Sequence, residues 1–286
     1  MQTLREAIGQ YKAAGKAIGH FNFSDSNQLK AIAMAAKESG LPVIAGLSEG
    51  EREFFPLAHA KALVELYRAD GIQIYLNADH TYSVEKVEAA ITAGCDSVIF
   101  DGAKLPFEEN AKQAATCVAL ARASGRDIII ESELGYIGQS SKILTELPAG
   151  AALTSEMMTS AIDAKRFVTE TGIDCFAPAV GNIHGMVGVA KDPALNVARV
   201  KEISEAVDIP LVLHGASGNT EADIVACIKA GVAVVHINTE LRVTYRDSLK
   251  NTLNAGDEVA PYKFLAPSVT AMQTFLMEKM RLFAGQ

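Results

Sequence analysis

Short apolar runs recur along the chain, each followed by a longer stretch with helical spacing. The runs are too short for a typical helix and rich in β-branched residues, which is typical of strands buried on both faces. They are found at residues 17–23, 42–48, 72–80, 97–103, 127–135, 174–185, 210–218 and 233–239. The pattern therefore predicts eight buried strands separated by helices.

The stretches between these runs carry apolar residues at the spacing of an amphipathic helix. Residues 26–40 and 83–94 show it clearly, and in 219–231 Thr220 is placed to cap the helix N-terminus. At six junctions a glycine separates a helical stretch from the next run, where a left-handed residue is favoured. These glycines are Gly40, Gly71, Gly94, Gly125, Gly172 and Gly231.

A strand–helix unit repeated in this way predicts an α/β fold, a single (β/α)8 TIM barrel with parallel strands. The alternative, a doubly wound open sheet, usually has a GxGxxG sequence after the first strand, and this chain does not. We expect one domain over residues 1–286, because no linker or low-complexity segment divides it. Residues 136–160 are a long connection without periodicity, which is typical of a lid, and residues 265–285 predict a C-terminal helix.

Composition limits the partners and the location. The 286 residues are 49% hydrophobic, and the net charge of −8 offers no electrostatic basis for binding nucleic acid or an anionic membrane. The four cysteines form no CxxC pair, which is typical of buried thiols in a reducing compartment. The sequence shows neither a leader-like segment nor an apolar run of about 18 residues. We therefore expect a cytoplasmic protein.

Polar residues gather at the ends of the predicted strands, and in a TIM barrel these ends form the rim that carries the chemistry. Three of the six histidines, His80, His184 and His214, are placed at the ends of strands three, six and seven. Only closure of the barrel can bring them together. Three imidazoles with an open fourth position are typical of a catalytic zinc ion, although each histidine alone is also explained as an ordinary strand end.

The last two strands end in small and hydroxyl-bearing residues. Gly215, Ser217 and Gly218 follow strand seven, and Asn238 and Thr239 follow strand eight. Backbone N–H groups and hydroxyls at these two positions commonly bind phosphate in this fold. A glycine-rich turn explains either loop by itself, but their pairing at neighbouring strands favours a phosphate site.

Six stretches at the predicted strand ends form a specific set. They are NADH (77–80), SVIFDGA (97–103), ESELG (131–135), GNIHG (181–185), LHGASG (213–218) and INTELR (237–242). In content and order the set resembles the class II, zinc-dependent ketose-bisphosphate aldolases, a family that includes the fructose- and tagatose-1,6-bisphosphate aldolases. The resemblance implies reversible cleavage of a ketose 1,6-bisphosphate to dihydroxyacetone phosphate and a three-carbon aldehyde.

The resemblance also implies roles for the rim residues. His80, His184 and His214 would hold Zn²⁺. Glu133 would take the metal in an alternate position, and Asp79 would exchange a proton with the C4 hydroxyl. A monovalent cation, Na⁺ or K⁺, and assembly as a homodimer or homotetramer are further expectations. The residues expected to bind the phosphorylated sugar are Asn22, Ser48, Gly181, Gly185, Gly215, Ser217, Asn238 and Thr239.

The chain departs from the family at three places. Family members carry an acidic pair in the loop after ELG, where this chain has Ser140 and Ser141, so Glu146 is the nearest substitute for the second acid/base. His236 stands where an asparagine is usual, and Ala216 where a glycine is usual. The distal group of the substrate is therefore open, and a ketose 1-phosphate such as 6-sulfofructose 1-phosphate is the alternative.

The stretch NADH also carries a prediction about the backbone. Adjacent strand residues point to opposite faces of a sheet. Asp79 and His80 can therefore share one site only where the strand leaves regular geometry, and we expect a bend there.

Other classes of protein fit the residues less well. A Schiff-base aldolase needs a lysine inside the barrel, and only Lys104, just beyond strand four, comes near. A hydrolytic metal-dependent barrel usually has His-x-His on strand one, where this chain has HFN. A non-catalytic partner subunit of an aldolase assembly would not need to keep Asp79 with the three rim histidines. Metal analysis and an Asp79→Ala variant would separate that protein from an enzyme.

Overall fold

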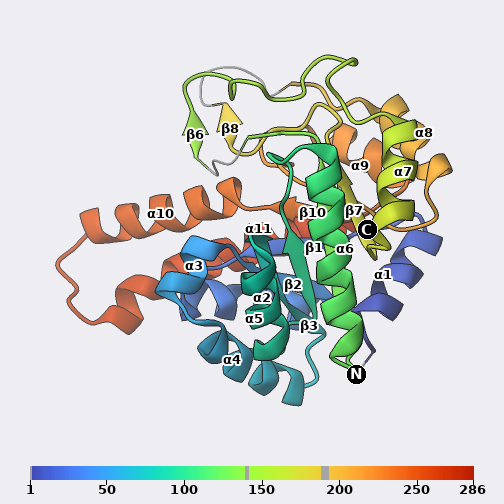
Figure 1. The fold of residues 1–286 in the computed structure, drawn as a ribbon. Helices are drawn as coiled ribbons and strands as arrows, with labels where there is room; N and C mark the ends of the chain where they lie inside the picture. The colour runs from blue at the N-terminus through green and yellow to red at the C-terminus, as the bar shows by residue number, and fades with distance from the viewer. Residues whose placement is uncertain (1, 139–141, 188–192) are drawn as a thin grey trace.

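The eight predicted strands close into a parallel barrel, which confirms the predicted TIM-barrel fold (Figure 1). This computed structural model describes residues 2–138, 142–187 and 193–286. Around the barrel the strands follow the order β1-β10-β9-β7-β5-β4-β3-β2. Their bounds are Ile18–Asn22 (β1), Val43–Leu47 (β2), Ile74–Thr81 (β3), Ser97–Phe100 (β4), Ile129–Leu134 (β5), Cys175–Pro178 (β7), Leu211–Leu213 (β9) and Val232–Ile237 (β10).

Helices connect successive strands and cover the outside of the barrel (Figure 1). The six junction glycines all have a positive φ, between 66° and 127°, as predicted. The helices are Leu4–Ala13 (α1), Ser26–Ser39 (α2), Glu49–Phe54 (α3), Leu57–Ala69 (α4), Val84–Ala93 (α5), Phe107–Ala123 (α6), Ala161–Thr171 (α7), Val197–Ala206 (α8), Glu221–Lys229 (α9), Thr239–Asn254 (α10) and Pro261–Phe283 (α11). None of the helices among the described residues is long and apolar enough to cross a membrane.

The inside of the barrel changes from apolar to polar along the strands. Alternate residues of a strand face the same side, and one inner layer is apolar and packs with Leu4 and Ile8 of α1. Its strand residues include Ile18, Ile44, Tyr75, Ile129, Val212 and Val234. Two residues further along five of these strands, buried polar side chains replace them: His20, Asn77, Glu131, His214 and His236. Because α1 packs against the apolar layer, the polar layer lies on the side of the carboxyl rim.

The long connection between β5 and α7 packs onto the loop that follows β7. Within it, Ile143–Leu144 (β6) pairs in parallel with Met186–Val187 (β8), and this pair lies outside the barrel in Figure 1. Ile137, Ala152 and Ala179 form a small apolar cluster between the two segments. The predicted lid segment is thus joined to the loop that carries His184. Ser140 and Ser141 lie outside the described residues.

The sixth and seventh strand predictions are too long. The sixth strand was expected over 174–185 and the seventh over 210–218, but β7 ends at Pro178 and β9 at Leu213, and a loop follows each. Ala179, Val180 and Ile183 in the loop after β7 are nevertheless buried. Burial makes a run apolar whether or not its backbone pairs in a sheet, so the sequence pattern extended the strand into the loop.

Candidate active site

A cavity at the carboxyl ends of the strands brings most of the predicted site residues together. It is lined by Asn22, Asp79, His80, His184, Gly185, His214, Gly215, Ser217, His236, Asn238 and Thr239. A second cavity of about 170 Å³ shares Asp79, His80, His184 and Asn238 with it and adds Ser48, Glu49, Gly50, Tyr82 and Arg242. Among the predicted residues, Gly181, Glu133 and Glu146 line neither cavity.

The end of β3 places Asp79 and His80 in the same cavity by breaking the strand geometry. His80 has a φ of 35°, the one positive φ among the non-glycine residues that the structure describes. The pairing of β3 with β4 also shifts register between Ala78 and Thr81. The Arg52 guanidinium holds this distorted end by donating to the backbone oxygen of Asp79 at 2.9 Å. The predicted bend is therefore confirmed.

His184 is oriented by the lid segment. Its Nδ1 lies 2.8 Å from the backbone oxygen of Gly138. A carbonyl oxygen can only accept, so Nδ1 carries the proton and Nε2 keeps its lone pair. That Nε2 is buried and has no hydrogen-bond partner. His184 thus presents a ligand nitrogen that the protein leaves unused.

The other two histidines are oriented by carboxylates. His214 places Nε2 2.7 Å from Glu131 Oε1, and its Nδ1 is buried without a partner. His80 places Nδ1 3.0 Å from Asp101 Oδ2. Carboxylates that hold the outer nitrogen of a metal-binding histidine fix the ring and the tautomer. Glu131 and Asp101 fit this supporting role.

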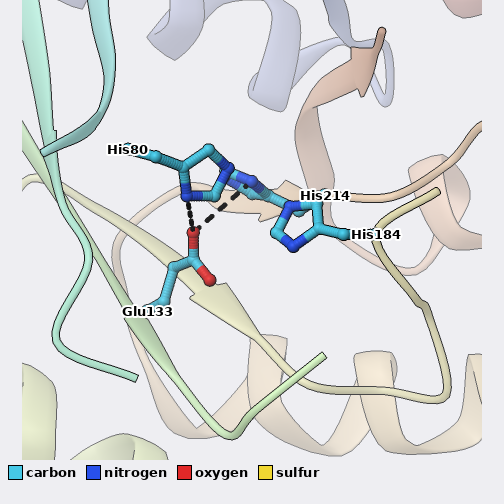
Figure 2. A group of neighbouring side chains, drawn as sticks. All are labelled: His80, Glu133, His184 and His214. Atoms are coloured by element: carbon cyan, nitrogen blue, oxygen red, sulfur yellow. Dashed lines mark ion pairs between the residues drawn. The ribbon is translucent and has the colours of Figure 1, made fainter. Parts of the chain in front are cut away.

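Glu133 lies against two of these imidazoles (Figure 2). Its Oε1 is 3.2 Å from His80 Nδ1 and 3.5 Å from His214 Nδ1, and it has no hydrogen-bond partner. One ligand atom from each of His80, Glu133, His184 and His214 lies within 4.8 Å of all the others. Three of the four residues, Glu133, His184 and His214, contribute a buried atom without a hydrogen-bond partner. Ligand atoms that converge in this way fit a metal ion with histidine and carboxylate ligands.

The ionisation of these residues follows from their burial and their mutual charges. Burial, with the neighbouring His80, lowers the pKa of His184 and of His214 to about 3, so both rings are neutral and able to bind a metal. Burial also acts to lower the pKa of His80, but the Asp79 and Glu133 carboxylates outweigh it and hold that pKa well above the ordinary value. A metal ion would displace the extra proton of His80.

Asp79 is held as an ionised carboxylate. Its Oδ2 accepts a hydrogen bond from Asn22 Nδ2 at 2.8 Å, and Oδ1 has no partner. Burial acts to raise the pKa of Asp79, but the charge of His80 and the hydrogen bond from Asn22 act against it, and the pKa lies below its usual range. A free, ionised oxygen in the cavity suits a general base.

The predicted phosphate residues surround the start of α10. Asn238 precedes this helix and Thr239 begins it, and both line the cavity, so the N-terminus of α10 lies at the cavity wall. Ser217 Oγ accepts from the backbone N–H of Glu240 at 3.4 Å. Gly215 has a φ of 59°, and a Cβ there would come within 2.1 Å of the Ile183 oxygen. Only glycine lets the loop after β9 approach the His184 loop so closely.

Three predicted residues lie elsewhere. Gly181 is in the loop after β7, where a Cβ would meet the Ala194 oxygen at 2.8 Å, so it serves close backbone packing. Glu146 is exposed on the lid segment and outside both cavities. Lys104, the candidate for a Schiff base, lies over the Tyr136 ring at 5.6 Å and also lines neither cavity.

Two buried histidines were not assigned a role from the sequence. His20 and His236 stack with ring centroids 3.6 Å apart, and His236 also stacks on His214 at 4.0 Å. Gly46 makes room for this column, because a Cβ there would come within 2.3 Å of the His20 ring. Period-two alternation along β1, from Ile18 through His20 to Asn22, was the signal that could have placed His20 inside the barrel.

The fold and the site together define a class of protein. A closed (β/α)8 barrel carries three metal-directed imidazoles, a free carboxylate and a helix N-terminus at its carboxyl rim. This is the arrangement of a metal-dependent barrel enzyme that binds an anionic substrate beside the metal.

Comparison with known proteins identifies the family. The profile described as "Fructose-bisphosphate aldolase class-II" matches residues 2–286, and the chain belongs to that family. The protein is thus a class II aldolase, a lyase that cleaves a carbon–carbon bond.

Relatives cover nearly the whole chain. A probable fructose-bisphosphate aldolase of Bacillus subtilis (strain 168) is 34% identical, with 99% of this chain and 97% of the relative covered. A 6-phospho-5-dehydro-2-deoxy-D-gluconate aldolase of Bacillus licheniformis is 32% identical, with 99% and 94% covered. Among solved structures, the YdjI aldolase of Escherichia coli K12 matches with a TM-score of 0.84 and 28% identity, covering 98% of this chain and 96% of that one.

Proposed function

We propose that the protein catalyses the zinc-dependent, reversible aldol cleavage of a ketose 1,6-bisphosphate, of the fructose or tagatose type, to dihydroxyacetone phosphate and a three-carbon aldehyde. The observation that carries the proposal is the shared cavity of Asp79, the three histidines and the phosphate-type loops. A carboxylate base, a metal site and an anion site are the parts that this reaction needs within one substrate length.

His80, His184 and His214 are the residues that would hold the zinc. Their free or displaceable nitrogens and the absence of thiolates from the cluster suit a three-histidine catalytic site. Bound there, Zn²⁺ supplies positive charge that polarises the substrate carbonyl. Glu133, at 3.2 Å from His80 Nδ1, is the carboxylate that would take the ion in the alternate position.

Asp79 accepts the proton of the C4 hydroxyl during cleavage. As the O–H bond breaks, C4 becomes the aldehyde carbon and the electron pair of the C3–C4 bond remains on C3. In condensation, Asp79 returns the same proton. Asn22 keeps the carboxylate oriented by donating to Oδ2 at 2.8 Å, which leaves Oδ1 for the substrate.

The phosphate of the dihydroxyacetone half binds where α10 begins. Gly185, Gly215 and Ser217 line the cavity from two loops, and Asn238 and Thr239 line it from the helix start. Backbone N–H groups at a helix N-terminus favour an anion without a dedicated basic residue. An acidic chain with a net charge of −8 can therefore bind an anionic sugar locally.

The second proton transfer, to C3 of the dihydroxyacetone half, is assigned to Glu146. This residue lies on the lid segment between β5 and α7, exposed and outside both cavities. The assignment therefore requires the lid to bring Glu146 over the cavity when substrate binds. A Glu146→Gln variant that exchanges deuterium into dihydroxyacetone phosphate at the wild-type rate would contradict it.

A ketose 1-phosphate with another distal group, such as 6-sulfofructose 1-phosphate, is the second candidate substrate. The relative from Bacillus licheniformis is named for a substrate with a carboxylate and a single phosphate. The distal end of the substrate thus differs among relatives of this chain. The cavity that carries Asp79 and the histidines would serve both candidates equally.

The first experiment measures release of dihydroxyacetone phosphate from fructose and tagatose 1,6-bisphosphates. The assay is run on the protein as purified, after EDTA, and after zinc is added back. We expect activity to be lost to the chelator and restored by Zn²⁺. The sugar that is cleaved faster indicates which configuration at C4 the enzyme prefers. Activity that survives EDTA would overturn the three-histidine site and reopen the Schiff-base alternative.

A further inference from the structure

The short helix α3, Glu49–Phe54, lies against the end of β3 that carries Asp79. Arg52 donates to the backbone of Asp79. Glu51 accepts from the Asn22 amide, which also donates to the Asp79 carboxylate. Neither Glu51 nor Arg52 lines the cavity of the three histidines or the cavity beside Asp79. Any effect of these two residues on the reaction must therefore act through the residues that they hold.

Arg52 connects the ends of two neighbouring strands. β2 and β3 pair as far as Leu47 and Ala78. The Nη1 group of Arg52 donates to the backbone oxygens of Leu47 at 2.7 Å and Asp79 at 2.9 Å. Its Nη2 group donates to Thr81 Oγ1 at 3.2 Å. The guanidinium thus continues the connection between the two strands beyond their last paired residues.

The backbone between Asp79 and Thr81 needs such a connection, because His80 has a φ of 35°. Few residues with a side chain adopt this region, and they keep it only where the surrounding structure determines it. Arg52 holds a residue on each side of His80. Its three acceptors are neutral oxygens reached from two nitrogens of one planar group, and the single ammonium group of a lysine cannot reproduce that geometry.

Glu51 fixes the carboxylate of Asp79 through Asn22. Asn22 Nδ2 donates to Glu51 Oε2 at 2.9 Å and to Asp79 Oδ2 at 2.8 Å. A side-chain amide has two N–H donors on its nitrogen and an acceptor on its oxygen. The two carboxylates together therefore favour the orientation in which the nitrogen of Asn22, and not its oxygen, faces Asp79.

Glu51 is itself held in place. It is buried, and its Oε2 also accepts from the backbone N–H of Ser48 at 2.8 Å and from Ser48 Oγ at 2.9 Å. Its Oε1 accepts from Ser24 Oγ at 3.4 Å and pairs with Arg242. These partners come from three separate segments of the chain, so Glu51 offers Asn22 an acceptor in a fixed position.

We propose that Glu51 and Arg52 are positioning residues for Asp79: Arg52 fixes its backbone, and Glu51 fixes its carboxylate through Asn22. The inference rests on the proposed function, in which Asp79 exchanges a proton with the C4 hydroxyl of the substrate. A base acts only within hydrogen-bond reach of the proton, and a displacement of about 1 Å can lower a rate about 100-fold. The two residues therefore contribute to the step that uses Asp79 and to no other step.

The first test replaces the guanidinium of Arg52. Arg52→Lys keeps the positive charge but loses the planar group, so we expect kcat for cleavage to fall about 100-fold, with KM little changed. Arg166→Lys is the matched control, because Arg166 is a half-exposed arginine on α7 that pairs with Glu108 and Glu170, and it keeps the wild-type kcat. Equal kcat in Arg52→Lys and the wild type would overturn the role of Arg52, while the proposed cleavage would stand.

A cavity of about 290 Å³ between α3, α4 and α5 makes a rescue experiment possible. Arg52 lines it together with Leu57 of α4 and Lys86 of α5. In Arg52→Ala, free guanidinium can reach the vacated place through this cavity. We expect guanidinium chloride, at concentrations too low to unfold the protein, to raise kcat of this variant at least about tenfold. Sodium chloride at the same ionic strength should not, and equal effects of the two salts would overturn the role assigned to the guanidinium group.

Deuterium exchange into dihydroxyacetone phosphate separates the positioning of Asp79 from damage to the whole site. In the proposed mechanism this half-reaction transfers a proton at C3 and not at the C4 hydroxyl, so it does not use Asp79. Arg52→Lys and Glu51→Gln should therefore exchange at the wild-type rate while cleavage falls, about tenfold in Glu51→Gln. A parallel fall of exchange and cleavage in both variants would show that they disturb the site as a whole, and would overturn the proposal.

A double-mutant cycle with Asp79→Asn measures whether Arg52 acts through Asp79. Residues that act through one another have non-additive effects. In the Asp79→Asn background we expect Arg52→Lys to lower kcat by less than about threefold, against about 100-fold in the wild-type background. Equal losses in the two backgrounds would mean that Arg52 acts independently of Asp79.

A structural comparison keeps the proposal testable if the proposed function fails. Failure of the wild-type protein to cleave either bisphosphate would contradict the proposed function, but not the positioning of Asp79. Crystal structures of the wild-type protein and of Arg52→Lys then decide. We expect the Asp79 carboxylate to shift by about 1 Å in the variant and His80 to lose its positive φ. An unchanged segment from Asp79 to Thr81 would overturn the proposal.

Discussion

Two groups of histidines lie side by side in this barrel, and they differ in how their rings face one another. The rings of His80, His184 and His214 meet at interplanar angles of 76° to 87°. The rings of His20 and His236 are parallel within 6° and stack at 3.6 Å. A metal ion binds in the plane of an imidazole, along the lone pair of the nitrogen. Crossed rings can aim their lone pairs at one point, and parallel stacked rings cannot.

The difference shows that proximity alone does not define a metal site. His20, Asp79 and His236 also offer ligand atoms within 4.8 Å of one another. Because the two rings are stacked, one ion cannot lie in both ring planes. Each ring of the first group, moreover, has an acceptor on its outer nitrogen, namely Asp101, Gly138 or Glu131. Ring orientation and outer partners therefore favour the first group as the proposed ligand set.

We expect the largest effect when the group of His80, His184 and His214 is disrupted. His184→Ala removes a ligand nitrogen, so we expect less than about a tenth of the wild-type metal content and a loss of activity of at least about 1,000-fold. His20→Ala removes an equally buried imidazole from the stacked pair and should keep the wild-type metal content. Elemental analysis of the purified proteins measures both. Equal metal loss in the two variants would contradict the distinction between the groups.

The next prediction distinguishes the loss of the proton acceptor from the loss of the metal. Asp79→Asn keeps the size of the side chain and removes the proton acceptor, so we expect kcat to fall by about 100- to 10,000-fold. The metal content should stay at the wild-type level, because Asp79 is not among the four converging ligand residues. Cleavage assays with metal analysis on the same sample measure both quantities. Loss of the metal would instead make Asp79 a ligand.

Several residues of the cavity could be predicted from the sequence, because the ends of the strands form the rim of a barrel. The places of the three proposed ligand histidines and Asp79 in one cavity follow from their positions at the ends of apolar runs. The bend at His80 follows from the need to aim two adjacent residues at one cavity. His184 lines this cavity although β7 ends well before it. The apolar run records burial, and both the strand and the loop after it are buried.

The partners of the ligands could not be predicted in the same way. The outer partner of His184 is a backbone oxygen, that of Gly138, and every residue has such an oxygen. Glu131 on β5 reaches His214, 83 positions away at the end of β9, over the intervening strand β7, so the pairing depends on the curvature of the sheet. The stacking of His20 on His236 depends on the register of β1 against β10, which pairs these two residues. A hydrophobic pattern carries no information on register between non-consecutive strands.

A smaller effect tests the outer partners of the ligand histidines. Asp101→Asn and Glu131→Gln each replace a carboxylate by an amide of the same shape, and we expect the affinity for the metal to fall about 10- to 100-fold. Asn77→Asp is a useful contrast, since Asn77 Oδ1 is 3.0 Å from His20 Nε2 in the stacked pair. We expect little change of metal affinity there. Competition with a chromophoric chelator measures all three, and unchanged affinity in Asp101→Asn would contradict the supporting role.

All histidines of the two groups except His80 have a lowered pKa, and this gives the last prediction, for the metal-free protein. Several groups have shifted pKa values: lowered in His20, His184, His214 and His236, and raised in His80, Glu131 and Glu133. From about pH 4.5 to 6.5 the unfolded chain protonates the four histidines that stay neutral when folded, while the folded chain keeps protons on the two glutamates. The unfolded state binds more protons, so stability rises with pH.

Above about pH 6.5 the pH dependence of stability reverses, and stability falls as the pH rises. The four neutral histidines no longer differ between the states, but the folded chain keeps the proton of Glu131, whose pKa is about 8, and that of His80, while the unfolded chain loses both. The stability of the metal-free protein should therefore be greatest near pH 6.5. His20→Ala removes one of the four histidines. Below about pH 6.5 it should therefore reduce the slope of the free energy of unfolding against pH by about 1.4 kcal/mol per pH unit. Urea unfolding of EDTA-treated protein between pH 5 and 8 measures it, and a slope unchanged by His20→Ala would mean that His20 is not held neutral by the fold.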